Sequence, residues 1–265
     1  MLTTEQIAHF ETFGFVVRRQ CFSATEMAEI TSAFDDVLTA DRKGQPFDGA
    51  SRQAVLGFIE KRPLLSGLAE DDRIYQPLEQ LLGPGFVWIG SDGNLYVGDT
   101  SWHPDGSVLD YGRIKVAFYL DRVTKDTGCL RVIPGSHQQP LHAALDPLLG
   151  QRADSNHRPF DTDGPGVPSF PLESQPGDVV FFNQNLWHAA FGGKTGRRMF
   201  TMNFGAQPSK DEHIDFLKRV YQSNLKHVEN MQYTQSARVY EDAFLYSEQP
   251  RIKGMVGKLV ELGFK

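Results

Sequence analysis

The chain has 265 residues, of which 40% are hydrophobic and 23% are charged, and its formal net charge is −6. A chain of this length buries a full core without staples, and two cysteines, Cys21 and Cys129, cannot build a disulfide framework. We therefore expect a reducing, cytoplasmic location. The acidic balance excludes nucleic-acid binding as the main function, because such binding requires clustered Lys and Arg. No apolar stretch reaches the length of a membrane span, and the first residues lack the basic and apolar regions of a secretory signal.

The N-terminal region predicts two helices around a short strand. Thr3 with Gln6 three residues later is typical of a capping box, and Ser23 begins a second box of the same kind. Apolar residues recur at helical spacing after both caps, whereas the residues at 15–17 predict a strand. We expect residues 1–84 to form a helical scaffold.

From about residue 85 to 207, short apolar segments alternate with Gly, Pro and Asp, a pattern that favours a sandwich, jelly roll or small barrel. A polar, Pro- and Gly-rich insert at 134–178 interrupts this pattern, and we expect it to be a lid without regular structure. Residues 208–265 predict a helical tail. The predicted strands are Phe86–Ile89, Asn94–Val97, Ile114–Leu120, Cys129–Ile133, Ser169–Leu172, Val179–Phe182 and Met199–Phe204.

A candidate metal site lies within the predicted strands. His103 and Asp105 are two residues apart, so on an extended segment both side chains point to the same side. His188, directly after an apolar strand, is the best third ligand. Two imidazoles and one carboxylate leave three positions open on a metal, which suits non-haem Fe(II) that must bind oxygen and a co-substrate. Arg197 and Arg198 open the next strand, and one of them can bind a carboxylate with its guanidinium fork.

His-x-Asp alone is a weak signal, but the ordered set of motifs is specific. The chain contains SWHPDG, TGCLRVIPGSH, PGDVVFFNQNLWHAA and GRRMFTMNF, in this order. This set resembles the phytanoyl-CoA dioxygenase family of Fe(II)- and 2-oxoglutarate-dependent oxygenases, with the match running over roughly residues 85–207. The resemblance implies a mainly β, double-stranded β-helix (a cupin-like jelly roll) with flanking N- and C-terminal helices, here as a single dioxygenase domain over 1–265.

The resemblance also implies the chemistry. Iron would be held by His103, Asp105 and His188, with Arg197 preferred over Arg198 as the anchor of the far carboxylate of 2-oxoglutarate. Such an enzyme converts 2-oxoglutarate and O2 to succinate and CO2 while it oxidises a C–H bond of its substrate. Halogenating relatives replace the carboxylate ligand with a small residue, so the presence of Asp105 indicates hydroxylation or a related oxidation. The insert would form the substrate lid.

Further residues are candidates for the same pocket. Lys115 lies in an apolar strand, where an inward-facing Lys needs a carboxylate partner, and we assign it to the cofactor. Ala117 shares the face of Lys115 and is assigned with it. Asn94 and Tyr96, on the strand before the His-x-Asp motif, are candidates for hydrogen bonds to 2-oxoglutarate, and Trp102 is a candidate wall of the substrate pocket.

Two other classes of function stay open from the residues alone. One is a zinc hydrolase or isomerase on a cupin-like barrel, although it leaves the arginine after His188 without a role. The other is a non-catalytic 2-oxoglutarate-binding sensor. The mixed charge of the insert favours a small-molecule substrate with polar groups. We expect no nucleic-acid or membrane partner, and either a monomer or a homodimer.

Overall fold

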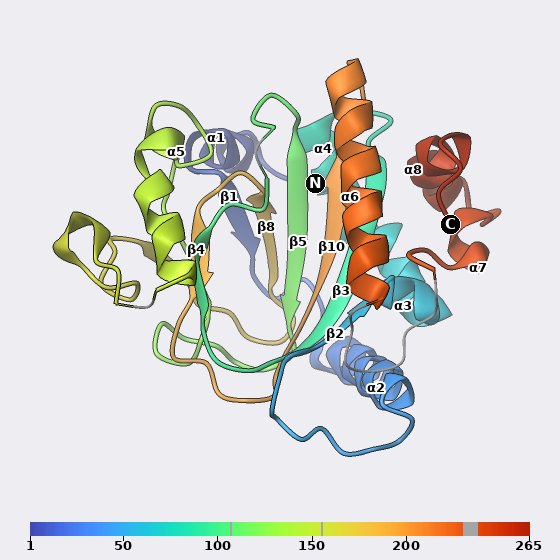
Figure 1. Ribbon diagram of the computed structural model, residues 1–265. Coiled ribbons are helices and arrows are strands. Elements are labelled where there is room, and N and C mark those ends of the chain that lie inside the picture. Colours follow the sequence, from blue (N-terminus) through green and yellow to red (C-terminus); the bar gives the residue numbers. More distant parts are fainter. Residues whose placement is uncertain (107, 155, 230–237) are drawn as a thin grey trace.

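The computed structural model describes residues 1–106, 108–154, 156–229 and 238–265. Helices flank a mainly β core, as Figure 1 shows. The strands are β1 (Phe15–Arg18), β2 (Gln53–Leu56), β3 (Val87–Tyr96), β4 (Thr100–His103), β5 (Arg113–Tyr119), β6 (Leu130–Val132), β7 (Phe170–Leu172), β8 (Val179–Asn183), β9 (His188–Ala190) and β10 (Arg197–Gly205). The α-helices are α1 (Thr4–Phe13), α2 (Ala24–Asp41), α3 (Pro63–Ser66), α4 (Asp72–Leu82), α5 (Leu141–Ala144), α6 (Asp211–Glu229), α7 (Asp242–Leu245) and α8 (Pro250–Glu261), and the 3-10 helices are η1 (Phe58–Lys61), η2 (Gly67–Ala69), η3 (Asp146–Arg152) and η4 (Pro159–Asp161).

The two predicted N-terminal capping boxes are present. The Thr3 hydroxyl accepts a hydrogen bond from the backbone N–H of Gln6, and the Gln6 side chain accepts one from the backbone N–H of Thr3. Ser23 and Glu26 make the same reciprocal pair at the start of α2. Gly14 ends α1 in the left-handed conformation with φ 85°, which a residue without a Cβ adopts at no steric cost. Local sequence therefore fixes both helix starts.

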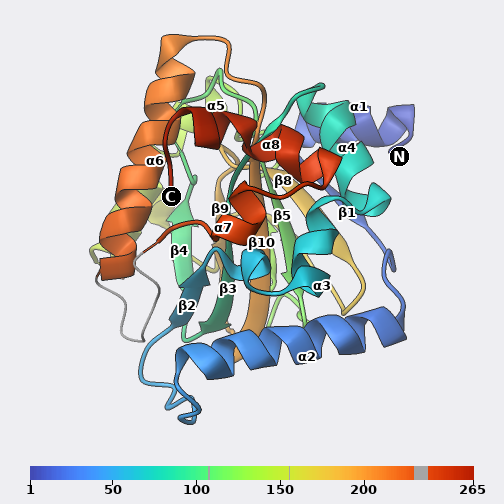
Figure 2. The ribbon, with the colours of Figure 1, turned by 90° about the vertical axis from the view of Figure 1, so that its right-hand side faces the viewer.

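Two antiparallel sheets form the core. The larger sheet has the strand order β1-β8-β5-β10-β3-β2, and the smaller sheet has the order β4-β9-β6-β7. Helices α2, α3, α4 and α8 contact or flank the larger sheet, whereas the insert with α5 and η3 lies beside the smaller sheet (Figures 1 and 2). The mainly β class with flanking helices is confirmed.

The larger sheet has two different faces, because successive residues of a strand point to opposite sides. On β10, Phe200 and Met202 are fully buried in the main apolar core together with residues of the flanking helices. Arg197, Met199 and Thr201 point the other way, toward the smaller sheet, and line a cavity. The fold thus separates a packing face from a pocket face within single strands.

The predicted strand boundaries were wrong at several points. Phe86–Ile89 and Asn94–Val97 belong to one strand, β3, which continues through a Gly- and Ser-containing stretch. Gly93 reads as a break in the sequence, but its missing side chain makes room for the Phe58 ring, which would lie 2.2 Å from a Cβ there. The strands β2, β4 and β9 were not predicted.

The insert at 134–178 is more regular than predicted. It contains α5, η3 and η4 in addition to β7, which matches the predicted strand Ser169–Leu172, and η3 packs against β4. The tail after Pro208 is helical as predicted, with Leu217 of α6 and both Met255 and Leu259 of α8 buried. Among the helices that the structure describes, none combines the length and apolarity needed to cross a membrane.

Candidate metal centre and co-substrate pocket

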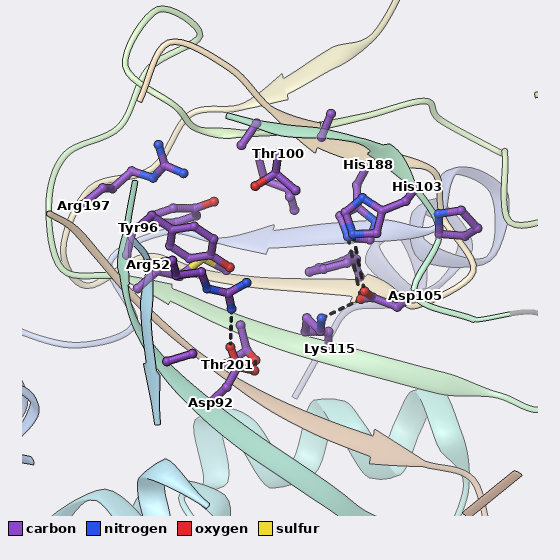
Figure 3. Close-up of a pocket in the computed structure, with 18 of the residues that line it drawn as sticks. Arg52, Asp92, Tyr96, Thr100, His103, Asp105, Lys115, His188, Arg197 and Thr201 are labelled. Carbon is purple, nitrogen blue, oxygen red and sulfur yellow. Dashed lines mark hydrogen bonds and ion pairs between the residues drawn. The ribbon is translucent and has the colours of Figure 1, made fainter. Parts of the chain in front are cut away.

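His103, Asp105 and His188 meet at one end of a cavity between the two sheets (Figure 3). His103 closes β4 and His188 opens β9, and these two residues face each other in the antiparallel register of the smaller sheet. The Nε2 atom of His103 lies 3.7 Å from Oδ1 of Asp105, and Nε2 of His188 lies 3.7 Å from Oδ2. Their potential ligand atoms all lie within 4.8 Å of one another. The fold therefore brings the three predicted ligands close enough together to bind one metal ion.

Backbone contacts orient both imidazoles for metal binding. Nδ1 of His103 lies 2.7 Å from the carbonyl oxygen of Ser101, and Nδ1 of His188 lies 2.8 Å from that of Leu186. A carbonyl oxygen accepts only, so each Nδ1 carries the proton and each Nε2 presents a lone pair toward the cavity. This tautomer is the one that a metal at the cavity end requires.

Burial keeps the two histidines neutral, against the opposing effect of the Asp105 carboxylate. Burial, reinforced by His188, lowers the pKa of His103 to about 3, and burial also lowers the pKa of His188. Burial alone would raise the pKa of Asp105, but the Lys115 ammonium holds it below its ordinary value. Two neutral imidazoles and one ionised carboxylate form a donor set that fits Fe(II) and leaves three coordination positions open.

Lys115 points into the cavity, as predicted for an inward-facing lysine on β5. Its Nζ lies 2.5 Å from Oδ2 of Asp105, and the side chains are 18% and 21% exposed. The carboxylate that pairs with Lys115 in this structure is Asp105. The assignment of Lys115 to the co-substrate stays a prediction, and its side chain lines the cavity.

Arg197 lies at the other end of the cavity from the His–Asp–His group (Figure 3). It is 2% exposed, and its Nε and Nη1 atoms have no hydrogen-bond partner among the described residues. The guanidinium carbon lies 5.1 Å from the centre of the Tyr96 ring. Gly128 and Gly193 make room for it, since a Cβ on either would collide with Nη1. A buried cation without a described counterion is a strong signal for an anionic ligand.

Arg198 takes a different position. Its guanidinium pairs with Asp121 at 2.9 Å and with Asp35 at 3.1 Å, on the side of the sheet that faces α2. Side-chain alternation along β10 explains why only one of the two adjacent arginines enters the cavity.

The cavity has a volume of about 420 Å³ and contains polar groups that the sequence did not single out. Asp92 and Thr201 face each other across β3 and β10, and the Thr201 hydroxyl donates to the Asp92 carboxylate. Arg52 lies against the Tyr96 ring, 3.5 Å from Asp92. Period-two spacing along β3 and β10 could have indicated Asp92 and Thr201, whereas Arg52 precedes an unpredicted edge strand and gives no such signal.

Three predicted pocket residues do not line the cavity. Trp102 is fully buried on the opposite side of β4 from His103, and its indole N–H donates to the carbonyl of Gly164 at 2.8 Å. Asn94 is buried beneath Arg52, whose Nε donates to its side-chain oxygen at 2.9 Å. Ala117 is fully buried in an apolar cluster of the sheet interior. Trp102 therefore packs against the insert. Asn94 and Ala117 are on the cavity-facing side of β3 and β5, but neighbouring side chains cover them.

Two named proteins are similar to this chain over about three quarters of its length. A probable phytanoyl-CoA dioxygenase of Caenorhabditis elegans is 23% identical over 74% of this chain and 72% of that protein. The ectoine dioxygenase of Sphingopyxis alaskensis is 23% identical over 73% of this chain and 72% of that protein.

Among solved structures, HygX of Streptomyces hygroscopicus with nickel and 2-oxoglutarate bound has a TM-score of 0.61 at 21% identity, covering 78% of this chain and 88% of HygX. EctD of S. alaskensis with bound iron has a TM-score of 0.59 at 23% identity, covering 77% of each chain.

The fold, with a His–Asp–His group at one end of its cavity and a buried arginine at the other, defines the class of non-haem iron, 2-oxoglutarate-dependent oxygenases. The sequence profile of the phytanoyl-CoA dioxygenase (PhyH) family matches residues 10–200, which is more than half of the chain. The chain belongs to this family.

Proposed function

We propose that this protein oxidises a C–H bond of a polar small molecule, using Fe(II) held by His103, Asp105 and His188 and 2-oxoglutarate anchored by Arg197. The observation that supports the proposal is that one cavity has a candidate metal site at one end and a buried cation at the other. One end offers a neutral–neutral–anionic ligand set, and the other offers a buried guanidinium without a described counterion. A dicarboxylate that chelates a metal at one end and carries its second charge at the other matches both.

The residues of the pocket have separate tasks in this reaction. Bound iron would supply the oxidising chemistry, in which O2 and 2-oxoglutarate become succinate and CO2 while one oxygen atom enters the substrate. Arg197 binds the far carboxylate with its fork, and the Tyr96 and Tyr119 rings beside it line the same cavity. Phe182 and Leu130 contribute apolar lining that excludes water from the reacting atoms.

The remaining lining favours a substrate with polar or charged groups. Arg52 and Asp92 line the cavity from the larger sheet, and Arg152 of η3 lines it from the insert. One relative is named for such a compound, ectoine dioxygenase, and the structurally similar HygX was crystallised with hygromycin B bound. We further propose that the two sheets form a double-stranded β-helix and that residues 1–265 act as one dioxygenase domain.

Succinate formation by the purified protein tests this function. We expect succinate release that requires both Fe(II) and 2-oxoglutarate, and that is abolished in His103→Ala and in Asp105→Ala. His157→Ala, which removes an exposed imidazole of the insert, is the matched control and keeps the activity. Succinate release that survives the first two changes, or turnover with zinc and none with iron, would refute the proposal.

A further inference from the structure

Lys115 places a permanent cation against the carboxylate of the candidate metal site. It lies on β5, between β8 and β10 of the larger sheet, so its backbone is fixed on both sides. The ammonium lies 2.5 Å from Oδ2 of Asp105 and 6.0 Å from the centre of the Phe182 ring. A lysine this enclosed is costly unless its charge is used, and its pairing with Asp105 meets that cost.

Another carboxylate lies on the same face but is already engaged. Asp92 accepts hydrogen bonds from Thr201 and Asn94 and lies 3.5 Å from Arg52. The partner of Lys115 is therefore Asp105. Each carboxylate oxygen lies 3.7 Å from one imidazole, Oδ1 from Nε2 of His103 and Oδ2 from Nε2 of His188, so the ammonium at Oδ2 is what distinguishes the two oxygens.

We propose that Lys115 is a positioning residue that keeps Oδ2 of Asp105 for itself and leaves Oδ1 alone for the metal. The inference rests on the proposed function, since it assumes a metal at His103, Asp105 and His188. A carboxylate free on both sides can bind a metal with both oxygens and occupy a further coordination position. With Oδ2 bound to the ammonium, Asp105 contributes one oxygen, and three positions stay open for 2-oxoglutarate and O2.

The same cation has an electrostatic consequence. A positive charge a few ångströms from a divalent metal opposes its binding, and it opposes a trivalent metal more strongly. Lys115 therefore lowers the affinity for metal in exchange for an open coordination sphere and a preference for ferrous over ferric iron. A lysine that only held Asp105 in place would instead raise the affinity for metal. Removing Lys115 therefore strengthens metal binding if the proposal is right and weakens it if the lysine only holds Asp105.

The test uses Mn(II), which binds such ligand sets, stays divalent in air and reports its bound waters through the relaxation of water protons. The variants are Lys115→Met, Lys115→Arg and Lys210→Met. The last removes a lysine that lies 2.5 Å from Asp110 on the protein surface, with side chains 55% and 50% exposed, and is the matched control. Thermal unfolding of each variant checks that it is folded before the titration.

We expect Lys115→Met to bind Mn(II) about tenfold more tightly than the unaltered protein, because the opposing charge is gone. Its Mn(II)-bound waters fall from about three to about two, because Asp105 then chelates with both oxygens. Lys115→Arg retains the cation and stays near the unaltered protein in both measurements, as does Lys210→Met. For iron, Lys115→Met lowers the Fe(III)/Fe(II) potential and speeds the loss of the ferrous state in air.

Equal or weaker Mn(II) binding by Lys115→Met would overturn the proposal, and so would tighter binding with an unchanged number of waters. If Lys115→Met does not fold, the test uses Lys115→Arg. A loss of one Mn(II)-bound water in Lys115→Arg, which retains the cation, would overturn the proposal. Failure of the proposed function looks different. In that case Mn(II) binding is unchanged in His103→Ala. If His103→Ala loses Mn(II) binding but the Lys115 variants bind Mn(II) as the unaltered protein does, only the role of the lysine is contradicted.

Discussion

The two faces of the six-stranded sheet use the same strands for different physical tasks. On the helix side, Phe118 and Phe200 stack with ring centres 4.7 Å apart and are fully buried. On the cavity side, the neighbouring positions are Lys115, Thr201 and Arg197. Alternation within β5 and β10 thus places an aromatic layer directly behind a polar pocket. The aromatic layer supplies the stability that allows the cavity side to hold charges that a core would not tolerate.

Two buried carboxylates illustrate the same contrast. Glu60, on the helix side, accepts hydrogen bonds from the Trp88 indole at 2.9 Å and from the backbone N–H of Glu241 at 2.7 Å. Burial nevertheless raises the pKa of Glu60 to about 7. On the cavity side, the Lys115 ammonium overcomes burial and lowers the pKa of Asp105. Neutral hydrogen-bond donors do not offset the cost of a buried charge as nearby cations do.

The largest effect on stability is expected on the helix side. Phe200→Ala removes a fully buried ring that contacts Phe118 and Phe58, and we expect a loss of about 3–5 kcal/mol in the free energy of unfolding. Chemical denaturation measures this loss. Mn(II) affinity of the folded variant stays unchanged, because the ring does not line the cavity. A matching loss of metal affinity would show that the two faces are not separable.

The next effect is expected at the far end of the cavity. Arg197→Met removes the buried guanidinium, and we expect a loss of about 3 kcal/mol in 2-oxoglutarate binding, or roughly 100-fold in Kd. The free energy of unfolding does not fall, since no described carboxylate loses its partner. Arg198→Met is the control: it loses a partly buried ion pair with Asp121 and a more exposed one with Asp35, but it keeps the affinity for 2-oxoglutarate. Equal losses of 2-oxoglutarate affinity in both variants would contradict the assignment.

The third effect is a pH dependence of the free energy of unfolding, caused by the buried carboxyl group of Glu60 on the helix side. Because its pKa is raised above the ordinary value, the stability that its neutral form provides is fully present below about pH 4.5 and is lost as pH rises through about 7. We expect the free energy of unfolding to fall by about 2–3 kcal/mol between pH 5 and pH 8 relative to that of Glu60→Gln. Denaturant midpoints across that range measure it. Parallel pH profiles for the two proteins would rule the shift out.

Local chemistry explains how much of the fold could be predicted. The capping boxes at Thr3 and Ser23 depend on neighbouring residues alone, and both are confirmed. The break predicted between two strands was wrong because Gly93 accommodates Phe58, a contact between distant parts of the chain. The edge strand β2 carries no period-two pattern of its own, since its pairing with β3 decides its conformation. Signals that require tertiary contacts were missed.

The same division applies to the site. His103, Asp105, His188 and Arg197 were predicted from an ordered set of motifs, and the fold brings them to one cavity. The partner of Lys115 could not be predicted, because a lysine facing inward specifies only that it needs an anion. Two carboxylates could have met that need, Asp92 on β3 and Asp105 in the bend after β4, and only the tertiary structure places Asp105 at the ammonium.

The smallest effect tests the side on which Trp102 lies. Trp102→Phe removes the hydrogen bond from the indole to Gly164 while it keeps most of the buried ring, and we expect a loss of about 1 kcal/mol in the free energy of unfolding. Because His103 next to it faces the cavity, alternation directs Trp102 away from bound substrate. The rate of succinate formation and the Kd for 2-oxoglutarate therefore stay unchanged. A change in the rate or in the Kd without a loss of stability would show that Trp102 contacts the substrate pocket. The insert, against which Trp102 packs, would then form part of that pocket.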